Sequence, residues 1–256
     1  MTGVEIDSRR ISPGDLFVAL GRGVEYLDDA RRRGAGATLV PADEFAAMAA
    51  LGSAVRERSD VRVVAITGST GKTSTKDILA ALCRPFAPTV AAEEGHNNEI
   101  GLPLTLTRIG PDTSVAITEM GMRGPGQIAA LCRIAQPEIG VITNVGPVHL
   151  ELLGTVAEVA KAKAEVIQAL PPNGVAVIPA HAPELEPFVP ADREVRRFAA
   201  PPAELRDGWM HVRWRDREIP FSFTARHQAL NAAAALTVVE ALGLPLPEGP
   251  VEVAFS

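Results

Sequence analysis

This chain of 256 residues lacks the features of membrane, secreted and nucleic-acid-binding proteins. It contains no run of about 18 apolar residues, so we expect no membrane-spanning helix. The segment that begins at Met1 has neither a basic start nor an apolar core, and we expect no signal peptide. Lysine and arginine total 25 residues against 31 aspartates and glutamates, so the charge balance does not favour nucleic acid as a partner.

Cysteine is also scarce, because Cys83 and Cys132 are the only two. Cys83 lies in an apolar helical pattern, and we predict two buried thiols rather than a disulfide or a metal pair. This usage is typical of a cytoplasmic protein. The remaining composition, 46% hydrophobic and 22% charged, is that of a globular protein with one large or two modest domains.

The most informative segment is a glycine-rich turn that follows the apolar run 63–66 and precedes an amphipathic helical pattern. Backbone N–H groups of such a turn bind phosphate oxygens. Lys72 is placed to reach the β- and γ-phosphates, and the Thr73 hydroxyl can bind Mg²⁺. The predicted ATP- or GTP-binding residues are Gly68, Ser69, Thr70, Gly71, Lys72, Thr73 and Ser74. The strict motif has glycine where this chain has Ile66, so an ordinary strand-to-helix turn is the alternative.

The order of elements predicts an α/β protein, with a small α/β N-terminal domain followed by a mostly parallel sheet of the phosphate-loop type flanked by helices. We place the two domains at residues 1–58 and 59–256. The predicted strands of the second domain are 61–67, 114–119, 139–145 and 174–179, and a late antiparallel hairpin pairs 212–214 with 218–223. The predicted helices are 73–82, 126–135, 155–170 and 229–242.

Two polar residues follow predicted parallel strands, whose carboxyl ends meet at the ligand-binding edge of such a sheet. Glu119 ends one strand and is a natural Mg²⁺ ligand beside Thr73. Alternatively, it caps the loop 121–126. His149 follows another strand, where a histidine is either part of a nucleotide and metal site or an ordinary surface residue.

Lys163 falls on the apolar face of the predicted helix 155–170, whereas Lys161 falls on its polar face. A lysine on an apolar face must extend its ammonium to solvent, pair with another polar group or be chemically modified, because burying a bare ammonium is costly. A carbamate on its nitrogen would create an anion able to bind a metal. Asn231 lies one turn into the helix that starts near His227, where its amide can either read an adenine edge or cap the helix.

These motifs together resemble the Mur ligase family of bacterial cell-wall synthesis. The resemblance covers nearly the whole chain and rests on segments 7–9, 13–20, 67–73, 96–105, 119–126 and 148–151. Segments 96–105, 119–126 and 148–151 most resemble the member that joins D-alanyl-D-alanine to UDP-N-acetylmuramoyl-tripeptide. The resemblance therefore implies an ATP-dependent peptide ligase that forms an acyl phosphate, with ATP and Mg²⁺ as cofactors. It implies a cytoplasmic enzyme, and we expect a monomer.

The resemblance also implies roles for single residues. Lys72, His149 and a carbamylated Lys163 are expected to be catalytic. Thr73 and Glu119 are expected to bind a first Mg²⁺, and His149 and Lys163 a second. The expected substrate contacts are Ser8 and Arg9, near the uridine nucleotide, together with Asn97 and Asn98, and the expected adenine contact is Asn231.

The chain departs from the family pattern at two places. Family members carry a third, C-terminal domain that closes over ATP, and Ser256 stands where we expect that domain to begin. An Asp-Gly-His segment of the N-terminal domain is replaced by residues 23–26. Three alternatives therefore stay open: a Mur ligase that adds a single amino acid, an ATP-binding remnant without ligase activity, and a folylpolyglutamate synthase-like ligase, which the uridine-type N-terminal segment disfavours.

Overall fold

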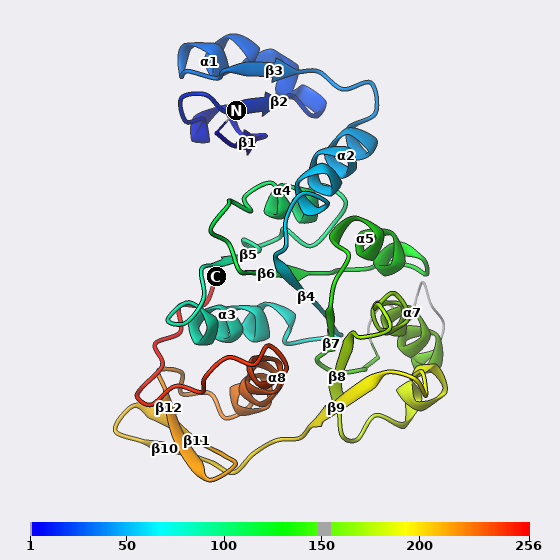
Figure 1. Cartoon of the computed structure of the whole chain (residues 1–256), viewed down its shortest axis with the longest axis vertical. Coiled ribbons are helices and arrows are strands. Elements are labelled where there is room, and N and C mark those ends of the chain that lie inside the picture. Colours follow the sequence, from blue (N-terminus) through cyan, green and yellow to red (C-terminus); the bar gives the residue numbers. More distant parts are fainter. Residues whose placement is uncertain (1, 148–154) are drawn as a thin grey trace.

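The computed structural model describes residues 2–147 and 155–256, and it is built around a six-stranded sheet (Figure 1). Neighbouring strands run parallel in the order β5-β6-β4-β7-β8-β9. Their bounds are β4 Arg62–Thr67, β5 Thr89–Ala91, β6 Val115–Glu119, β7 Ile139–Ile142, β8 Val175–Pro179 and β9 Glu194–Phe198. The chain leaves β4 to one side for β5 and β6, and it later returns to the other side for β7. Ligands of such sheets bind beyond the carboxyl ends of the strands at this change of direction.

Helices cover both faces of the central sheet, and alternate residues of each strand point to opposite faces. On β4, Val64 and Ile66 pack with α3 and α8, whereas Val63 and Ala65 pack with α4, α5 and α7. The helices are α3 Lys72–Cys83, α4 Gly101–Leu106, α5 Gln127–Ala135, α7 Val156–Gln168 and α8 Gln228–Ala241. Coverage on both faces explains why the strands read as continuous apolar runs.

A smaller parallel sheet lies at the N-terminal end in the order β1-β2-β3. Its elements are β1 Val4–Glu5, β2 Leu16–Val18, β3 Ala37–Leu39 and the helix α1 Leu27–Arg32. Leu16 and Val18 pack against Met48 of α2 (Glu44–Arg56) and Leu104 of α4. Figure 1 shows α2 leading from this sheet to the central one. The division into domains 1–58 and 59–256 stays a prediction.

Three antiparallel strands form the third sheet, in the order β10-β11-β12. The predicted hairpin is present as β11 Trp209–Trp214 and β12 Arg217–Phe221, and β10 Ala203–Arg206 extends it. Val212 and Phe221 pack in the same apolar cluster as α3 and α8. The third sheet therefore covers part of the helical layer, on the side away from the central strands.

The predicted fold class is confirmed, but some element boundaries differ. The strand predicted over 139–145 ends at Ile142, because Thr143 and Asn144 leave the sheet to contact the phosphate loop. Helix α4, which contains Pro103, was not predicted from the sequence. Proline fits there because the N–H groups of a first helical turn need no partner within the helix.

Both cysteines are free thiols inside the central domain. Burial raises the pKa of each thiol to about 12, so both remain protonated near neutral pH. Within the described part of the chain, no helix combines the length and apolar character that crossing a bilayer requires.

Candidate nucleotide and metal site

The predicted phosphate loop is a tight turn between β4 and α3. Since α3 begins at Lys72, the N–H groups of its first turn face the loop. Gly71 has a φ of 77°, and a Cβ added there would lie 2.5 Å from Oδ1 of Asn231. A Cβ on Gly68 would overlap the hydroxyl of Thr143. Contacts within the protein therefore favour glycine at both positions.

The two residues after β7 hold this loop in place. Oδ1 of Asn144 accepts hydrogen bonds from the backbone N–H groups of Ser69 and Thr70, each over 2.9 Å. The Thr143 hydroxyl donates to the carbonyl of Thr70 over 2.6 Å. An acceptor oxygen thus lies where two loop amides converge, as a phosphate oxygen would. The strand predicted over 139–145 includes both residues. The polar pair after an apolar run could have indicated that the strand ends before them.

Glu119 and Thr73 come together at the carboxyl edge of the sheet, as predicted from the strand ends. The Thr73 hydroxyl donates to Oε2 of Glu119 over 2.8 Å, and the Asn97 side-chain amide donates to Oε1 over 3.0 Å. The alternative role for Glu119, capping the loop 121–126, is not observed. The side chains of Gln127 and Glu165 accept from the amides of that loop instead.

A cavity of about 440 Å³ lies beside these residues and gathers groups from distant parts of the chain. Lys72 lines it, and its ammonium donates to the carbonyl of Gly68 over 3.2 Å. Lys163 of α7 lines it from the other side. Further lining residues that the sequence analysis did not select are Phe45, Glu99, Ile100, Gly121, Met122, Arg123 and Gln127.

Lys163 is almost completely buried, with 2% of its surface exposed. Burial, reinforced by the charge of Lys72, lowers the pKa of its ammonium from 10.5 to about 8. Lys161 is exposed and pairs with Glu158 over 3.8 Å. Lys163 thus lies on the buried face of α7 and Lys161 on its exposed face, as the helical spacing predicted.

Asn97, Asn98 and Asn231 also lie near the phosphate loop. Asn97 and Asn98 line the cavity, but Oδ1 of Asn98 accepts from the backbone N–H groups of Ile100 and Gly101 at the start of α4. Asn231 donates to Gln228, whose side chain in turn donates to the Ser74 hydroxyl over 3.2 Å. The adenine contact expected of Asn231 stays a prediction.

Among the described residues, Ser8 and Arg9 lie outside this cavity. Ser8 is buried, and its hydroxyl donates to Asp29 over 2.9 Å inside the N-terminal unit. Arg9 is exposed and pairs with Asp7 of the same loop. His149 lies outside the described residues. The uridine-nucleotide contacts of Ser8 and Arg9 and the metal contact of His149 stay predictions.

The donor set at the cavity edge fits Mg²⁺. Thr73 offers a hydroxyl oxygen and Glu119 a carboxylate oxygen, and Mg²⁺ is usually held by one or two carboxylates together with substrate phosphates. Among the described residues, no three His, Cys, Asp or Glu side chains converge as they do in a metal site built only from protein. A metal here would therefore depend on a bound phosphate for further oxygen ligands.

Known proteins are similar to this chain in both sequence and fold. The Mur ligase middle domain matches residues 66–239, which include the loop, Glu119, Lys163 and Asn231. The chain belongs to the Mur ligase family. Among curated relatives of this Mur ligase, the UDP-N-acetylmuramoyl-tripeptide–D-alanyl-D-alanine ligase of Escherichia coli (strain K12) is 37% identical over 195 residues. The ligase of that name from Mycobacterium tuberculosis is 38% identical over 218 residues.

Solved structures of the family have the same fold. The MurF ligase from Thermotoga maritima in complex with ADP matches with a TM-score of 0.81 at 28% identity, over 96% of this chain and 64% of that one. The E. coli match covers 70% of this chain but 43% of the relative, and the M. tuberculosis match covers 70% and 43%. This Mur ligase thus spans less than half the length of the curated relatives it matches.

Proposed function

We propose that the chain acts in an ATP-dependent ligation that joins D-alanyl-D-alanine to UDP-N-acetylmuramoyl-tripeptide, a reaction of peptidoglycan precursor synthesis. The observation that carries this proposal is the cavity lined by Lys72, Lys163 and Asn97, with the Thr73–Glu119 pair next to it through the hydrogen bond from Asn97 to Glu119. These groups suit the transfer of a phosphoryl group to a bound carboxylate. The relatives named after this reaction support the choice of substrates.

The chain's own residues would bind and orient ATP. The loop N–H groups other than those of Ser69 and Thr70, which donate to Asn144, and the N–H groups of the first turn of α3 would hold the phosphates, and the Lys72 ammonium would offset charge on the transferred group. Thr73 and Glu119 would hold Mg²⁺, which when bound neutralises charge on the phosphate oxygens. The side chain of Asn231, on α8, lies next to Gly71 of the loop. We expect Asn231 to contact the adenine.

The reaction itself proceeds in two steps. The terminal carboxylate of the tripeptide attacks the γ-phosphorus of ATP, forming an acyl phosphate and releasing ADP. The amine of D-alanyl-D-alanine then attacks the acyl carbon, and the amide forms as inorganic phosphate leaves and the amine loses a proton. Positioning and electrostatics supply most of the rate enhancement in such transfers. We assign Ser8 and Arg9 to the uridine nucleotide of the acceptor, and Asn97 and Asn98 to substrate binding.

We further propose that Lys163 acts as a carbamate. With a pKa of about 8, about a tenth of its side chains are neutral at pH 7, and a neutral amine can attack CO₂. The amine and CO₂ give a carbamate and one proton. Carbamylation replaces a buried cation by an anion, and the carbamate together with His149 would hold a second Mg²⁺.

The choice of amine tests the main proposal. The chain is incubated with Mg²⁺, ATP and UDP-N-acetylmuramoyl-tripeptide, and the acyl phosphate is trapped with hydroxylamine as a hydroxamate. We expect hydroxamate in the absence of an amine, and amide formation with D-alanyl-D-alanine. Amide formation with a single diamino acid instead would favour the other type of Mur ligase. Binding of ATP without hydroxamate would favour a nucleotide-binding module without ligase activity.

A lysine pair on α7 tests the carbamate. Lys163→Ala should abolish hydroxamate formation, and added bicarbonate should not restore it. Lys161→Ala is the matched control, because Lys161 lies on the same helix but points to solvent. Normal turnover by Lys163→Ala would show that Lys163 only lines the cavity.

The cytoplasmic location and the monomeric state belong to the same proposal. Two buried free thiols support a reducing compartment. Size-exclusion chromatography coupled to light scattering measures the mass of the particle, and a dimer would contradict the proposed monomer.

A further inference from the structure

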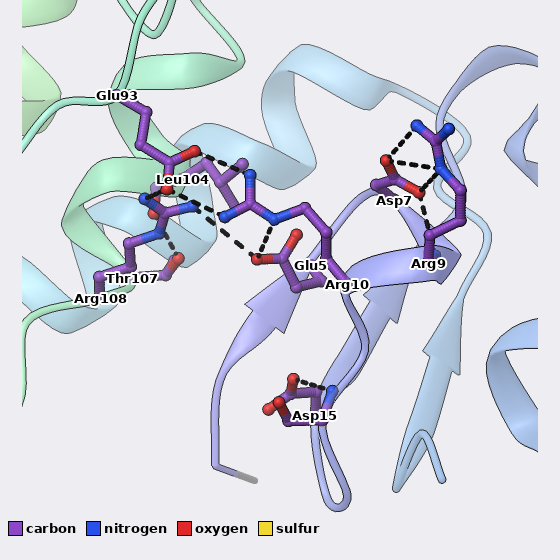
Figure 2. A network of polar contacts seen from close by, with 10 residues as sticks. Glu5, Asp7, Arg9, Arg10, Asp15, Glu93, Leu104, Thr107 and Arg108 are labelled. Carbon is purple, nitrogen blue, oxygen red and sulfur yellow. Dashed lines mark hydrogen bonds and ion pairs between the residues drawn. The ribbon is translucent and has the colours of Figure 1, made fainter. Parts of the chain in front are cut away.

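A cluster of charged residues joins the N-terminal sheet to the central domain. Figure 2 shows Arg10 and Arg108 pointing at Glu93 from two sides, with Glu5 between them. Arg10 donates to both oxygens of Glu93 over 2.8 and 2.9 Å, and Arg108 contacts Oε1 over 2.6 Å. Arg10 belongs to the N-terminal unit and Arg108 follows α4, so Glu93 is held from both parts of the molecule.

Glu93 is also the first residue of a turn that ends at Asn97. The carbonyl of Glu93 accepts from the N–H of His96 over 3.1 Å, and the carbonyl of Gly95 accepts from the N–H of Asn97 over 2.9 Å. Within the turn Glu94 is exposed and a Cβ on Gly95 would meet nothing within 4 Å, whereas the backbone of His96 packs closely against Gly101 at the start of α4. The turn is therefore held at Glu93, at His96 and at Asn97, and Glu93 is its contact with the N-terminal unit.

The far end of the turn contacts the predicted metal ligand. The Asn97 side chain donates to Oε1 of Glu119, and the Asn97 carbonyl accepts from the N–H of Gly121 over 2.8 Å. The other oxygen of Glu119 accepts from Thr73. A continuous series of contacts thus runs from the N-terminal sheet through the turn to the first turn of the phosphate-binding helix.

We propose that Glu93 is a positioning residue: it fixes the turn 93–97 so that Asn97 holds Glu119 in line with Thr73. The inference rests on the proposed function in so far as Thr73 and Glu119 hold Mg²⁺. Through Arg10, a shift of the N-terminal sheet would change the alignment of these two oxygens. A ligand bound by that sheet and the Mg²⁺–nucleotide would then alter each other's affinity by the same factor.

Glu93→Ala tests the inference in the chain of 256 residues. One readout is amide hydrogen exchange without nucleotide, at Gly121 and at core amides of β4. The other is the affinity for a non-hydrolysable ATP analogue with and without Mg²⁺. Glu25→Ala is the matched control, because Glu25 also accepts two hydrogen bonds from one arginine, Arg22, but within a single 3-10 helix.

For Glu93→Ala we expect exchange at Gly121 to rise about fivefold or more, with the β4 amides unchanged. The gain in affinity on adding Mg²⁺ should fall by about fivefold, with the Mg²⁺-free affinity unchanged. A general loss of stability would instead raise exchange everywhere and lower both affinities, and it would overturn the inference.

Other outcomes separate the inference from the proposed function. If wild type gains affinity with Mg²⁺ and Glu93→Ala behaves like Glu25→Ala, only the inference is wrong. If wild type gains no affinity with Mg²⁺, the Thr73–Glu119 metal site is wrong and the inference fails with it.

Discussion

Two lysines of the central domain are equally buried but have different surroundings. Lys76 of α3 and Lys163 of α7 each expose 2% of their surface. The Lys76 ammonium donates to the carbonyl of Ala92 over 2.8 Å and to the Ser256 hydroxyl over 2.9 Å, and it pairs with Asp77 over 2.9 Å. Lys163 instead lines the cavity near a second cation, Lys72, which helps to lower its pKa.

The difference separates a lysine with stabilising partners, Lys76, from the lysine that we propose to be functional, Lys163. A buried ammonium with acceptors on several sides recovers much of its lost hydration, and removing it leaves those acceptors unpaired. A buried ammonium beside another cation destabilises the fold, which is a recurrent property of functional sites. The two positions should therefore respond in opposite directions to the same substitution.

The largest effect is expected for Lys76→Met. Methionine keeps the approximate length but removes the donor to the Ala92 carbonyl and the cation that pairs with Asp77, which among the described residues keeps only its hydrogen bonds from Ser256. We expect the free energy of unfolding to fall by about 3–5 kcal/mol. Urea unfolding followed by circular dichroism measures the change, and a loss below about 1 kcal/mol would show that Lys76 is not a structural lysine.

Lys163→Met should raise the free energy of unfolding. The shift of the pKa from 10.5 to about 8 corresponds to about 3 kcal/mol of penalty for the charged form. In buffer freed of CO₂, so that no carbamate forms, we expect a gain of about 2–3 kcal/mol at pH 7. A loss of stability would show that the Lys163 ammonium has stabilising partners and would remove the contrast with Lys76.

Lys163→Met also tests whether the stability of wild type rises or falls with pH. Below pH 8, Lys163 is protonated in both the folded and the unfolded chain, so the full penalty applies. Between pH 8 and 10.5 the unfolded chain binds more protons than the folded one, and the stability of wild type rises with pH. The advantage of Lys163→Met should therefore shrink over this range. An advantage that is constant from pH 7 to 10.5 would contradict the lowered pKa.

The local spacing of apolar residues was enough to predict the burial of Lys163 but not that of Lys76. Apolar residues three and four positions before Lys163 define the buried face of its helix, so its burial could be predicted from spacing. Lys76 lies between Thr75 and Asp77, and its burial comes from β5 and from the segment that ends at Ser256. Partners 16 and 180 residues away in the chain leave no local signal.

The same distinction explains what was predicted of the site. The glycine-rich turn and the strand-end carboxylate Glu119 are each signals within one segment; Gly68 and Lys72 of the turn line the cavity, and Glu119 contacts Thr73 as expected. Asn144 bonded to the loop and Asn97 bonded to Glu119 depend on how separate segments meet. The short strands β1 and β9 were missed for a related reason, because β1 has two residues and β9 has charged residues at an edge.

The smallest effect on the free energy of unfolding is expected for Lys161→Met. This variant removes an exposed lysine from the helix that carries Lys163, so it separates the effect of burial from the effect of charge. Lys161 shares α7 with Lys163, but 63% of its side chain is exposed and its only ion pair among the described residues, with Glu158, spans 3.8 Å. Exposed pairs contribute little, so we expect a change within about 0.5 kcal/mol at pH 7 and at pH 10. If Lys161→Met instead stabilised the chain as much as Lys163→Met, the gain would come from replacing lysine by methionine on this helix. The buried ammonium would then not be the cause.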